Sequence, residues 1–107
     1  MVKQSAPQEL ADIAPKLVEV TDNVLFEDVW ERPELSPRDR SLVTVSVLAA
    51  LYRSEQLPYH LGKALENGLS VEELSEAITH LAFYAGWPNA LTAMTQLKKI
   101  ADDERAA

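Results

Sequence analysis

The sequence of 107 residues contains no cysteine, and this absence removes several kinds of chemistry. Without thiols the chain forms neither disulfides nor thiolate nucleophiles, and it has no cysteine-based metal or redox site. Only two histidines are present, His60 and His80, and neither belongs to an HExxH motif or a similar ligand spacing. We therefore expect no metal site built from protein side chains.

Basic residues are scarce as well. Ten lysines and arginines stand against seventeen acidic residues, which gives a net charge of −7 and argues against binding to a nucleic-acid backbone. No run reaches the roughly 18 apolar residues of a membrane span. The first ten residues, MVKQSAPQEL, also lack the apolar core of a signal peptide. We expect a cytoplasmic protein with no nucleic-acid partner and no membrane contact.

An uncharged segment from Ser41 to Tyr52 organises the middle of the chain. Ser36 as N-cap, Pro37 at the first helical position and Asp39 in the first turn predict that a helix begins here. The apolar residues of this helix spread around its whole circumference: Leu42, Val43, Val45, Val47, Leu48, Ala50 and Leu51. A helix that is apolar on all sides is expected to be buried on all sides, with a partner subunit supplying the cover that a small protomer lacks.

The segment before this helix is less regular. Apolar residues between Gln8 and Phe26 recur at helical spacing, but Pro15 interrupts them. The pattern predicts either a short turn followed by a helix from Pro15, or one kinked helix. An irregular connection then leads to Pro33, and within it Trp30 is expected to anchor a core or an interface.

Three further helices follow the central one. The first spans 55–66, has Pro58 in its first turn, and stops at Asn67 and Gly68. The second opens with the capping box of Ser70 and Glu73 and ends at Gly86. The last has Pro88 at its first position and is expected to fray from Asp102 onward.

No segment alternates between apolar and polar residues as a half-buried strand does. The sequence therefore predicts an all-α fold, a bundle of about five helices in which short turns join antiparallel hairpins. We expect a single domain over residues 1–107, with an N-terminal helical arm at 1–34 and the core at 35–100.

Two histidines and a few charged residues are candidates for chemistry. His60 lies at the border of the apolar face of its helix, either as a histidine that covers a hydrophobic patch or as a general acid or base. Glu55 either caps the same helix or faces His60 across a cleft. His80 is expected to be a surface or subunit-contact residue paired with Glu76. If the substrate is a carboxylate, one of the arginines near the two ends of the central helix should bind it: Arg38, Arg40 or Arg53.

Two segments, SPRDRSLVTVSVLAAL and EQLPYHLGKALENGLSVEELSEAITHLAFYAGWPNA, together resemble the carboxymuconolactone decarboxylase family. The resemblance runs from about Leu35 to Leu97. It includes an arginine-led helix start, a histidine after a polar break, an N-G-[LV]-[ST]-x-E-E turn and a Y-A-G-x-P-x-A ending. The resemblance implies an AhpD-like helical protomer that assembles as trimers or hexamers, with sites near subunit contacts.

The resemblance also separates two branches of the family. The alkylhydroperoxidase branch uses C-x-x-C-x-x-x-H, and matching on His60 puts Arg53 and Gln56 at the two cysteine positions and Ser41 at the position of an acid. A thiol peroxidase or peroxiredoxin mechanism is therefore excluded for this chain. The decarboxylase branch has a glutamate-containing turn before the same histidine, which Glu55 and His60 match.

The resemblance thus implies a lyase that needs no cofactor and acts on a small cyclic carboxylate or lactone. His60 is the expected proton donor, Glu55 its orienting partner, and Arg40 or Arg53 the clamp for the anion. Three further residues are expected to bind substrate: Gln56, Tyr84 and Trp87. Two alternatives remain, a non-catalytic family member whose helical oligomer binds a small ligand, and a purely structural subunit.

Overall fold

The computed structural model describes residues 4–106, which separate into two units at residues 4–37 and 38–106. This division lies close to the predicted boundary between arm and core, and the interpretation of both as one domain stays a prediction. Five α-helices and three short 3-10 or π-helical segments make up the described chain, and no strand occurs within it. The all-α fold predicted from the sequence is confirmed.

The first unit is a set of short helical segments. Its elements are the 3-10 turn η1 (Gln8–Asp12), the helix α1 (Pro15–Val20), its π-helical continuation η2 (Thr21–Phe26) and the 3-10 turn η3 (Val29–Glu31). The first of the two alternatives at Pro15 is therefore correct, because a short turn precedes a helix that begins at the proline. The carboxylate of Asp22 accepts the Ala6 amide at 2.7 Å, which ties the residues before η1 back to the helix. Trp30 is buried, as expected of an anchor.

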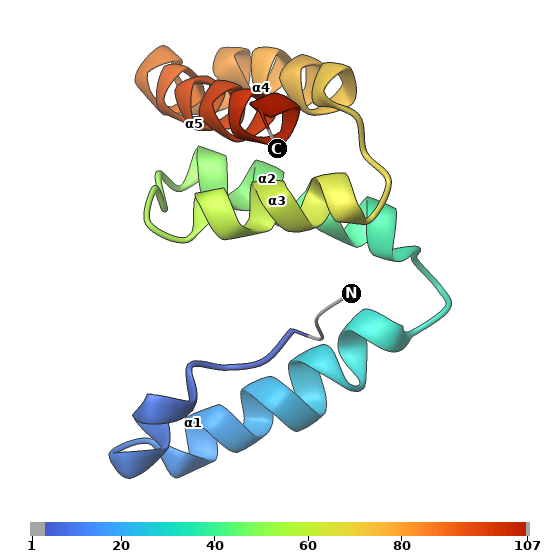
Figure 1. The fold of residues 1–107 in the computed structure, drawn as a ribbon, viewed down its shortest axis with the longest axis vertical. Helices are drawn as coiled ribbons and strands as arrows, with labels where there is room; N and C mark the ends of the chain where they lie inside the picture. The colour runs from blue at the N-terminus through green and yellow to red at the C-terminus, as the bar shows by residue number, and fades with distance from the viewer. Residues whose placement is uncertain (1–3, 107) are drawn as a thin grey trace. The chain divides into compact units, whose positions relative to one another are not determined.

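The second unit contains four long helices. They are α2 (Pro37–Ala50), α3 (Leu57–Glu66), α4 (Val71–Ala85) and α5 (Trp87–Ala106), of which α2 begins at the last residue of the first unit. Figure 1 shows α4 and α5 side by side in one layer and α2 with α3 in a second layer. The Asn67 side chain, just after α3, donates to the hydroxyl of Ser41 near the start of α2 at 2.9 Å, so these two helices run antiparallel. Both predicted hairpins are present.

One core holds the four helices together. Leucines and alanines from α3, α4 and α5 pack with two residues of α2, and the largest side chains in the core are fully buried: Leu57, Leu61, Leu74, Ile78, Leu97 and Val45. Burial of each leucine or isoleucine contributes about 1.5 to 3 kcal/mol to folding. Because Leu57, Leu61 and Ala64 lie in this core, the rotation of α3 about its own axis is fixed.

Two predicted helix ends are wrong. The helix that carries His60 begins at Leu57 rather than at Glu55, which remains in the preceding turn. At the other end of the chain α5 continues to Ala106 and does not fray from Asp102. The Asp102 carboxylate accepts Lys98 at 2.7 Å and also pairs with Arg105, and pairs one turn apart stabilise the end of a helix.

The protomer alone buries one side of α2, and the expectation that a partner subunit covers the rest stays a prediction. Ser41, Val45 and Ala49 face the core, whereas a stripe on another side remains about half exposed: Val43 at 55%, Val47 at 48% and Leu51 at 55%. The physical reason is that the second unit has only three other helices, and these are too few to surround α2 on every side. We call Val43 and Val47, together with Leu51 directly after the helix, the open stripe of α2.

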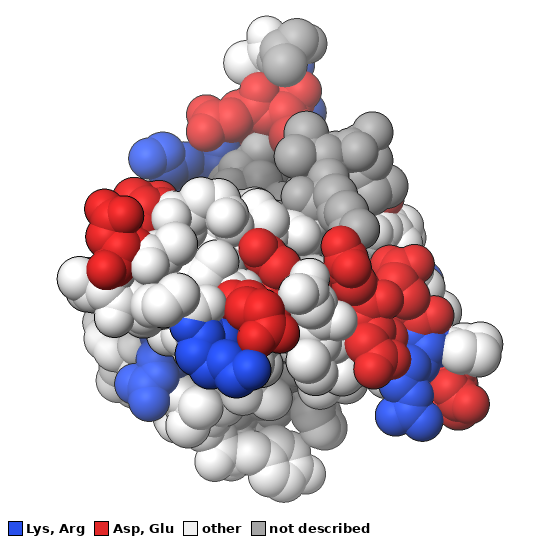
Figure 2. Space-filling model, turned by 90° about the horizontal axis from the view of Figure 1, so that it is seen from below, with Lys and Arg blue, Asp and Glu red and all other residues white. Residues whose placement is uncertain are grey.

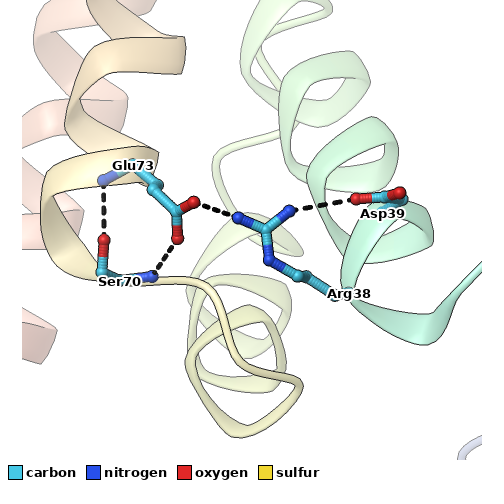
Figure 3. A network of polar contacts seen from close by, with 4 residues as sticks. All are labelled: Arg38, Asp39, Ser70 and Glu73. Atoms are coloured by element: carbon cyan, nitrogen blue, oxygen red, sulfur yellow. Dashed lines mark hydrogen bonds and ion pairs between the residues drawn. The ribbon is translucent and has the colours of Figure 1, made fainter.

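The start of α4 is fixed by a complete capping box (Figure 3). Ser70 accepts the Glu73 amide at 3.0 Å, and the Glu73 carboxylate accepts the Ser70 amide at 3.0 Å. Arg38, at the start of α2, contacts the same carboxylate and that of Asp39. The Ser70 amide, with Arg38 as a weaker contributor, holds the pKa of Glu73 below its usual value. One network therefore connects the first turns of α2 and α4.

Replacement of Ser70 by alanine is expected to lower the free energy of unfolding by about 1 kcal/mol, because the first turn of α4 loses its capping acceptor. Urea denaturation followed by circular dichroism measures this change. The matched control is Ser75→Ala within the same helix, which removes no cap and is expected to change stability by less than about 0.5 kcal/mol. Equal effects of the two substitutions would contradict the assignment of Ser70 as the cap.

Candidate functional site

The candidate catalytic residues lie in and just after the turn between α2 and α3, Glu55 in the turn and His60 at the start of α3. The Arg53 amide donates to the Leu48 carbonyl at 2.8 Å and the Tyr52 amide to the Ala49 carbonyl at 3.1 Å. This pair of bonds is a Schellman motif, in which Tyr52 occupies the left-handed position with φ of 59°. The chain reverses at this point, and α3 begins a few residues later.

His60 lies in the first turn of α3 and is partly buried. Its ring meets the ring of Tyr59 edge-on, with centroids 5.1 Å apart. Its Nδ1 atom is buried and has no hydrogen-bond partner among the described residues. Because burial disfavours the charged imidazolium, the pKa of His60 is lowered from its usual value of 6.5. At neutral pH the imidazole of the isolated protomer is therefore neutral.

Glu55 is exposed in the turn before α3. Within residues 4–106 its carboxylate makes no ion pair or hydrogen bond with His60 in the protomer. The pairing of Glu55 with His60 stays a prediction. Gln56 directly precedes α3, is exposed as well, and its side chain does not cap the helix.

The three arginines have different surroundings. Arg38 is engaged by Glu73 and Asp39, so it is not available as an anion clamp in this arrangement. Arg40 is partly buried and already interacts with other groups of the chain. Arg53 is exposed and borders a crevice beside Tyr52 and Asn89 that is too narrow for a water molecule.

Tyr84 and Trp87 lie near the junction of α4 and α5, and each belongs to a separate ring pair. Tyr84 is 81% exposed and its ring packs against His80 with centroids 5.1 Å apart. His80 is exposed, as expected, and its pairing with Glu76 stays a prediction. Trp87 is about half exposed and meets Phe83 edge-on. Trp87 also lines a shallow hollow of about 120 Å³ between the two helices, and Arg53 borders a different crevice. The protomer alone therefore does not join these residues to His60.

Sequence reasoning missed one polar side chain near the site. Lys63 lies one turn after His60 on α3 and is buried, with its ammonium 3.6 Å from the Glu66 carboxylate. The same carboxylate contributes to the raised pKa of Tyr59, after the larger effect of burial. On a helical wheel Lys63 lies away from Leu61, so no pattern in the sequence predicts its burial.

Charge on the surface agrees with the composition. On the face drawn in Figure 2, carboxylates cover more area than basic groups, and lysines and arginines form small separate clusters. Among residues 4–106, no helix is long and apolar enough to cross a membrane. Over the same described range, no group of three or more histidine, aspartate or glutamate side chains could hold a metal ion.

Comparison with known proteins identifies the class. The model of the carboxymuconolactone decarboxylase family matches residues 15–99, which is most of the chain. The protein therefore belongs to the carboxymuconolactone decarboxylase family, and the resemblance found in the sequence is confirmed.

Two curated relatives carry more specific names. The chain is 42% identical over 76 residues to a 4-carboxymuconolactone decarboxylase of Acinetobacter baylyi, covering 71% of this chain and 57% of the relative. It is 35% identical over 75 residues to a nitrosuccinic acid decarboxylase of Metarhizium robertsii, covering 70% of this chain and 52% of the relative. The chain thus spans little more than half the length of these relatives.

The resemblance matches three positions of this chain to the cysteines and the acid of the thiol branch, and the structure shows where they lie. Arg53 and Gln56, at the two cysteine positions, are both exposed. Ser41, at the position of the acid, is buried and accepts a hydrogen bond from Asn67. Ser41 therefore makes a structural contact between α2 and the end of α3 at the position that the resemblance matches to the acid.

Proposed function

We propose that the protein is a cytoplasmic decarboxylase that releases carbon dioxide from a small carboxylate, with a cyclic carboxylate or lactone as the expected substrate. The observation that carries this proposal is that both curated relatives are named as decarboxylases and align with most of this chain. The placement of His60 adds support, because a partly buried imidazole is suited to proton transfer near neutral pH.

The proposed chemistry needs no metal and no organic cofactor. Loss of carbon dioxide from a carboxylated lactone leaves an electron-rich dienolate, whose charge must be stabilised at oxygen and which must be protonated at carbon. His60 donates this proton, and Glu55 orients or tunes the imidazole. Arg40 or Arg53 binds the anionic substrate, while Gln56, Tyr84 and Trp87 complete the proposed substrate contacts.

Because the pKa of His60 is lowered, the protonated form that can donate is populated in the free protein only below that pKa. An anionic carboxylate close to the imidazole favours the charged imidazolium and so raises the pKa of His60 in the complex. Burial without substrate lowers that pKa in the free protein. We therefore expect proton uptake by His60 to accompany substrate binding.

The direct test is turnover of defined substrates by the purified protein. Carbon dioxide release is measured with 4-carboxymuconolactone, with nitrosuccinate, and with an uncarboxylated lactone as the control compound. Release from a carboxylated compound and none from the control would support the proposal. No release from any cyclic or nitro-substituted carboxylate in a wider panel would contradict it.

We further propose that the protein is a homo-oligomer, a trimer or a hexamer, in which the open stripe of α2 contacts a second copy. A stripe of Val43, Val47 and Leu51 exposed to water is unfavourable in a lone protomer, and Ser41 to Tyr52 carries no charge. Because each chain has a net charge of −7, an uncharged surface is where copies can approach with least repulsion.

The substitution Val47→Asp is expected to dissociate this oligomer, because each interface would then bury an unpaired carboxylate. The side chain is about half exposed in the protomer, so folding should be retained. Light scattering coupled to gel filtration should show a fall in mass to one chain. The control Thr95→Asp, at an exposed position of α5, should leave the mass unchanged. An unchanged mass for Val47→Asp as well would contradict the assignment of the open stripe as an interface.

A second candidate function is binding of a small ligand without catalysis. The observation that favours it is that, among the described residues, Glu55 makes no ion pair or hydrogen bond with His60 in the protomer. In this case calorimetry would detect binding of the lactone, and no carbon dioxide would be released over the same time.

A further inference from the structure

The turn that precedes α3 adopts a costly backbone conformation. At the end of α3, the left-handed position of a Schellman motif is occupied by Gly68, which adopts its φ of 107° without steric cost. At the end of α2 the equivalent position is Tyr52, with φ of 59°. A residue with a β-carbon is disfavoured there, so contacts from elsewhere in the protein must support this conformation.

One side of α5 supplies such contacts. Its polar residues Asn89, Thr92 and Gln96 recur at spacings of three and four and therefore share a face. The Asn89 side chain donates to the Ala50 carbonyl at 2.9 Å, and the Gln96 side chain donates to the Ser54 carbonyl at 2.9 Å.

These two bonds reach the backbone on both sides of Tyr52. Between them the Thr92 hydroxyl lies 3.5 Å from the phenol oxygen of Tyr52 itself. Leu57, at the start of α3, lies in the core and its amide donates to the Arg53 carbonyl at 3.1 Å. The polar face of α5 therefore holds the turn at the point where it leads into α3.

Gln96 carries a buried polar atom that lacks a hydrogen bond within the described part of the chain, which is energetically unfavourable. Its Nε2 atom is bonded to Ser54, but its Oε1 atom is buried without a hydrogen-bond partner among residues 4–106. An unsatisfied buried acceptor carries a desolvation cost that an apolar side chain of the same size would avoid. Packing alone therefore does not account for a glutamine here, whereas a need to hold the Ser54 carbonyl does.

We infer that Gln96, together with Asn89, is a positioning residue that holds the α2–α3 turn and thereby sets where Glu55 and His60 lie. The catalytic consequence of this inference rests on the proposed function, and its structural consequence does not. Gln96 itself lies on α5 and acts through the turn, since its side-chain bond is to the Ser54 backbone.

The test is Gln96→Met, which keeps the length of the side chain and removes the donor. Hydrogen exchange of the Arg53 and Leu57 amides, measured by NMR, is expected to become about three- to tenfold faster, because one supporting hydrogen bond is lost. The ring resonances of His60 should shift at the same time. The Leu74 amide, at the start of α4, should exchange at an unchanged rate.

Two comparisons keep this test specific. The control Thr95→Leu places an apolar side chain at the neighbouring exposed position and should alter neither readout. Asn89→Ala removes the other bond to the turn and should accelerate exchange of the Arg53 amide as well. If the protein is a decarboxylase, Gln96→Met should lower kcat more than it raises KM.

The inference is overturned if Arg53, Leu57 and His60 are unaffected in Gln96→Met, or if Thr95→Leu affects them equally. Failure of the proposed function has a different signature. In that case the wild-type protein would release no carbon dioxide, while the exchange rates and the His60 resonances would still respond to Gln96→Met.

Discussion

Replacement of His60 by alanine is expected to lower kcat/KM for decarboxylation by a factor of about 10² to 10⁴, the usual contribution of a positioned acid or base. The reason is that the substitution removes the proposed proton donor and leaves the helix around it in place. His60 is only partly buried, so the core that holds α3 should remain intact. Steady-state kinetics with the lactone measure kcat/KM, and circular dichroism shows whether the variant is folded.

The matched control is His80→Ala, which removes the other histidine of the chain. His80 is exposed and its ring contact is with Tyr84 at the far end of α4. Its loss is expected to change kcat/KM by no more than about twofold. Full turnover by a folded His60→Ala variant would remove His60 from the mechanism.

The largest effect on stability is expected from Leu61→Ala, which should lower the free energy of unfolding by about 2 to 5 kcal/mol. Leu61 is fully buried in the core shared by all four long helices, so truncation leaves a cavity as well as losing apolar contacts. A loss of this size is a large part of the stability of a small protein. Urea denaturation at several protein concentrations measures the change.

The control for this substitution is Leu91→Ala, which has the same chemistry at a position that is 59% exposed. With fewer contacts to lose, it should cost less than about 1 kcal/mol. Similar losses for Leu61→Ala and Leu91→Ala would contradict the arrangement of the core, since only one of these leucines faces it.

Much of the fold follows from local signals in the sequence. The capping box of Ser70 and Glu73 predicts the start of α4, and Pro37 and Pro15 mark the starts of α2 and α1. These signals work because a helix terminus depends on a few neighbouring residues. Gly68 likewise marks the end of α3 because its conformation is local.

The site could be predicted only in part, because side-chain partners depend on distant parts of the chain. Spacing placed His60 at the border of an apolar face, and the structure agrees by leaving it partly buried. Spacing could not show that Glu55 lies outside the helix or that Lys63 is buried. The left-handed conformation of Tyr52 was also unpredictable, since sequence preferences favour glycine there and the contacts that support Tyr52 come from α5.

The open stripe of α2 shows what an apolar sequence pattern leaves undetermined. The sequence correctly marks Val43, Val47 and Leu51 as apolar, and the short chain predicts that one protomer does not cover them, but periodicity cannot tell which side of α2 the protomer leaves open. Their exposure is the structural reason for placing a subunit contact on this face.

The most direct test of the central proposal compares the pKa of His60 with the pH dependence of turnover. In the His80→Ala variant, NMR titration of the single remaining imidazole gives the pKa of His60 in the free protein. Since burial lowers this pKa below 6.5, kcat/KM should fall as pH rises through the same value, and the pKa that governs kcat should be higher. A kcat/KM profile that shows no transition at the measured pKa of His60, or that rises there with increasing pH, would contradict His60 as the proton donor.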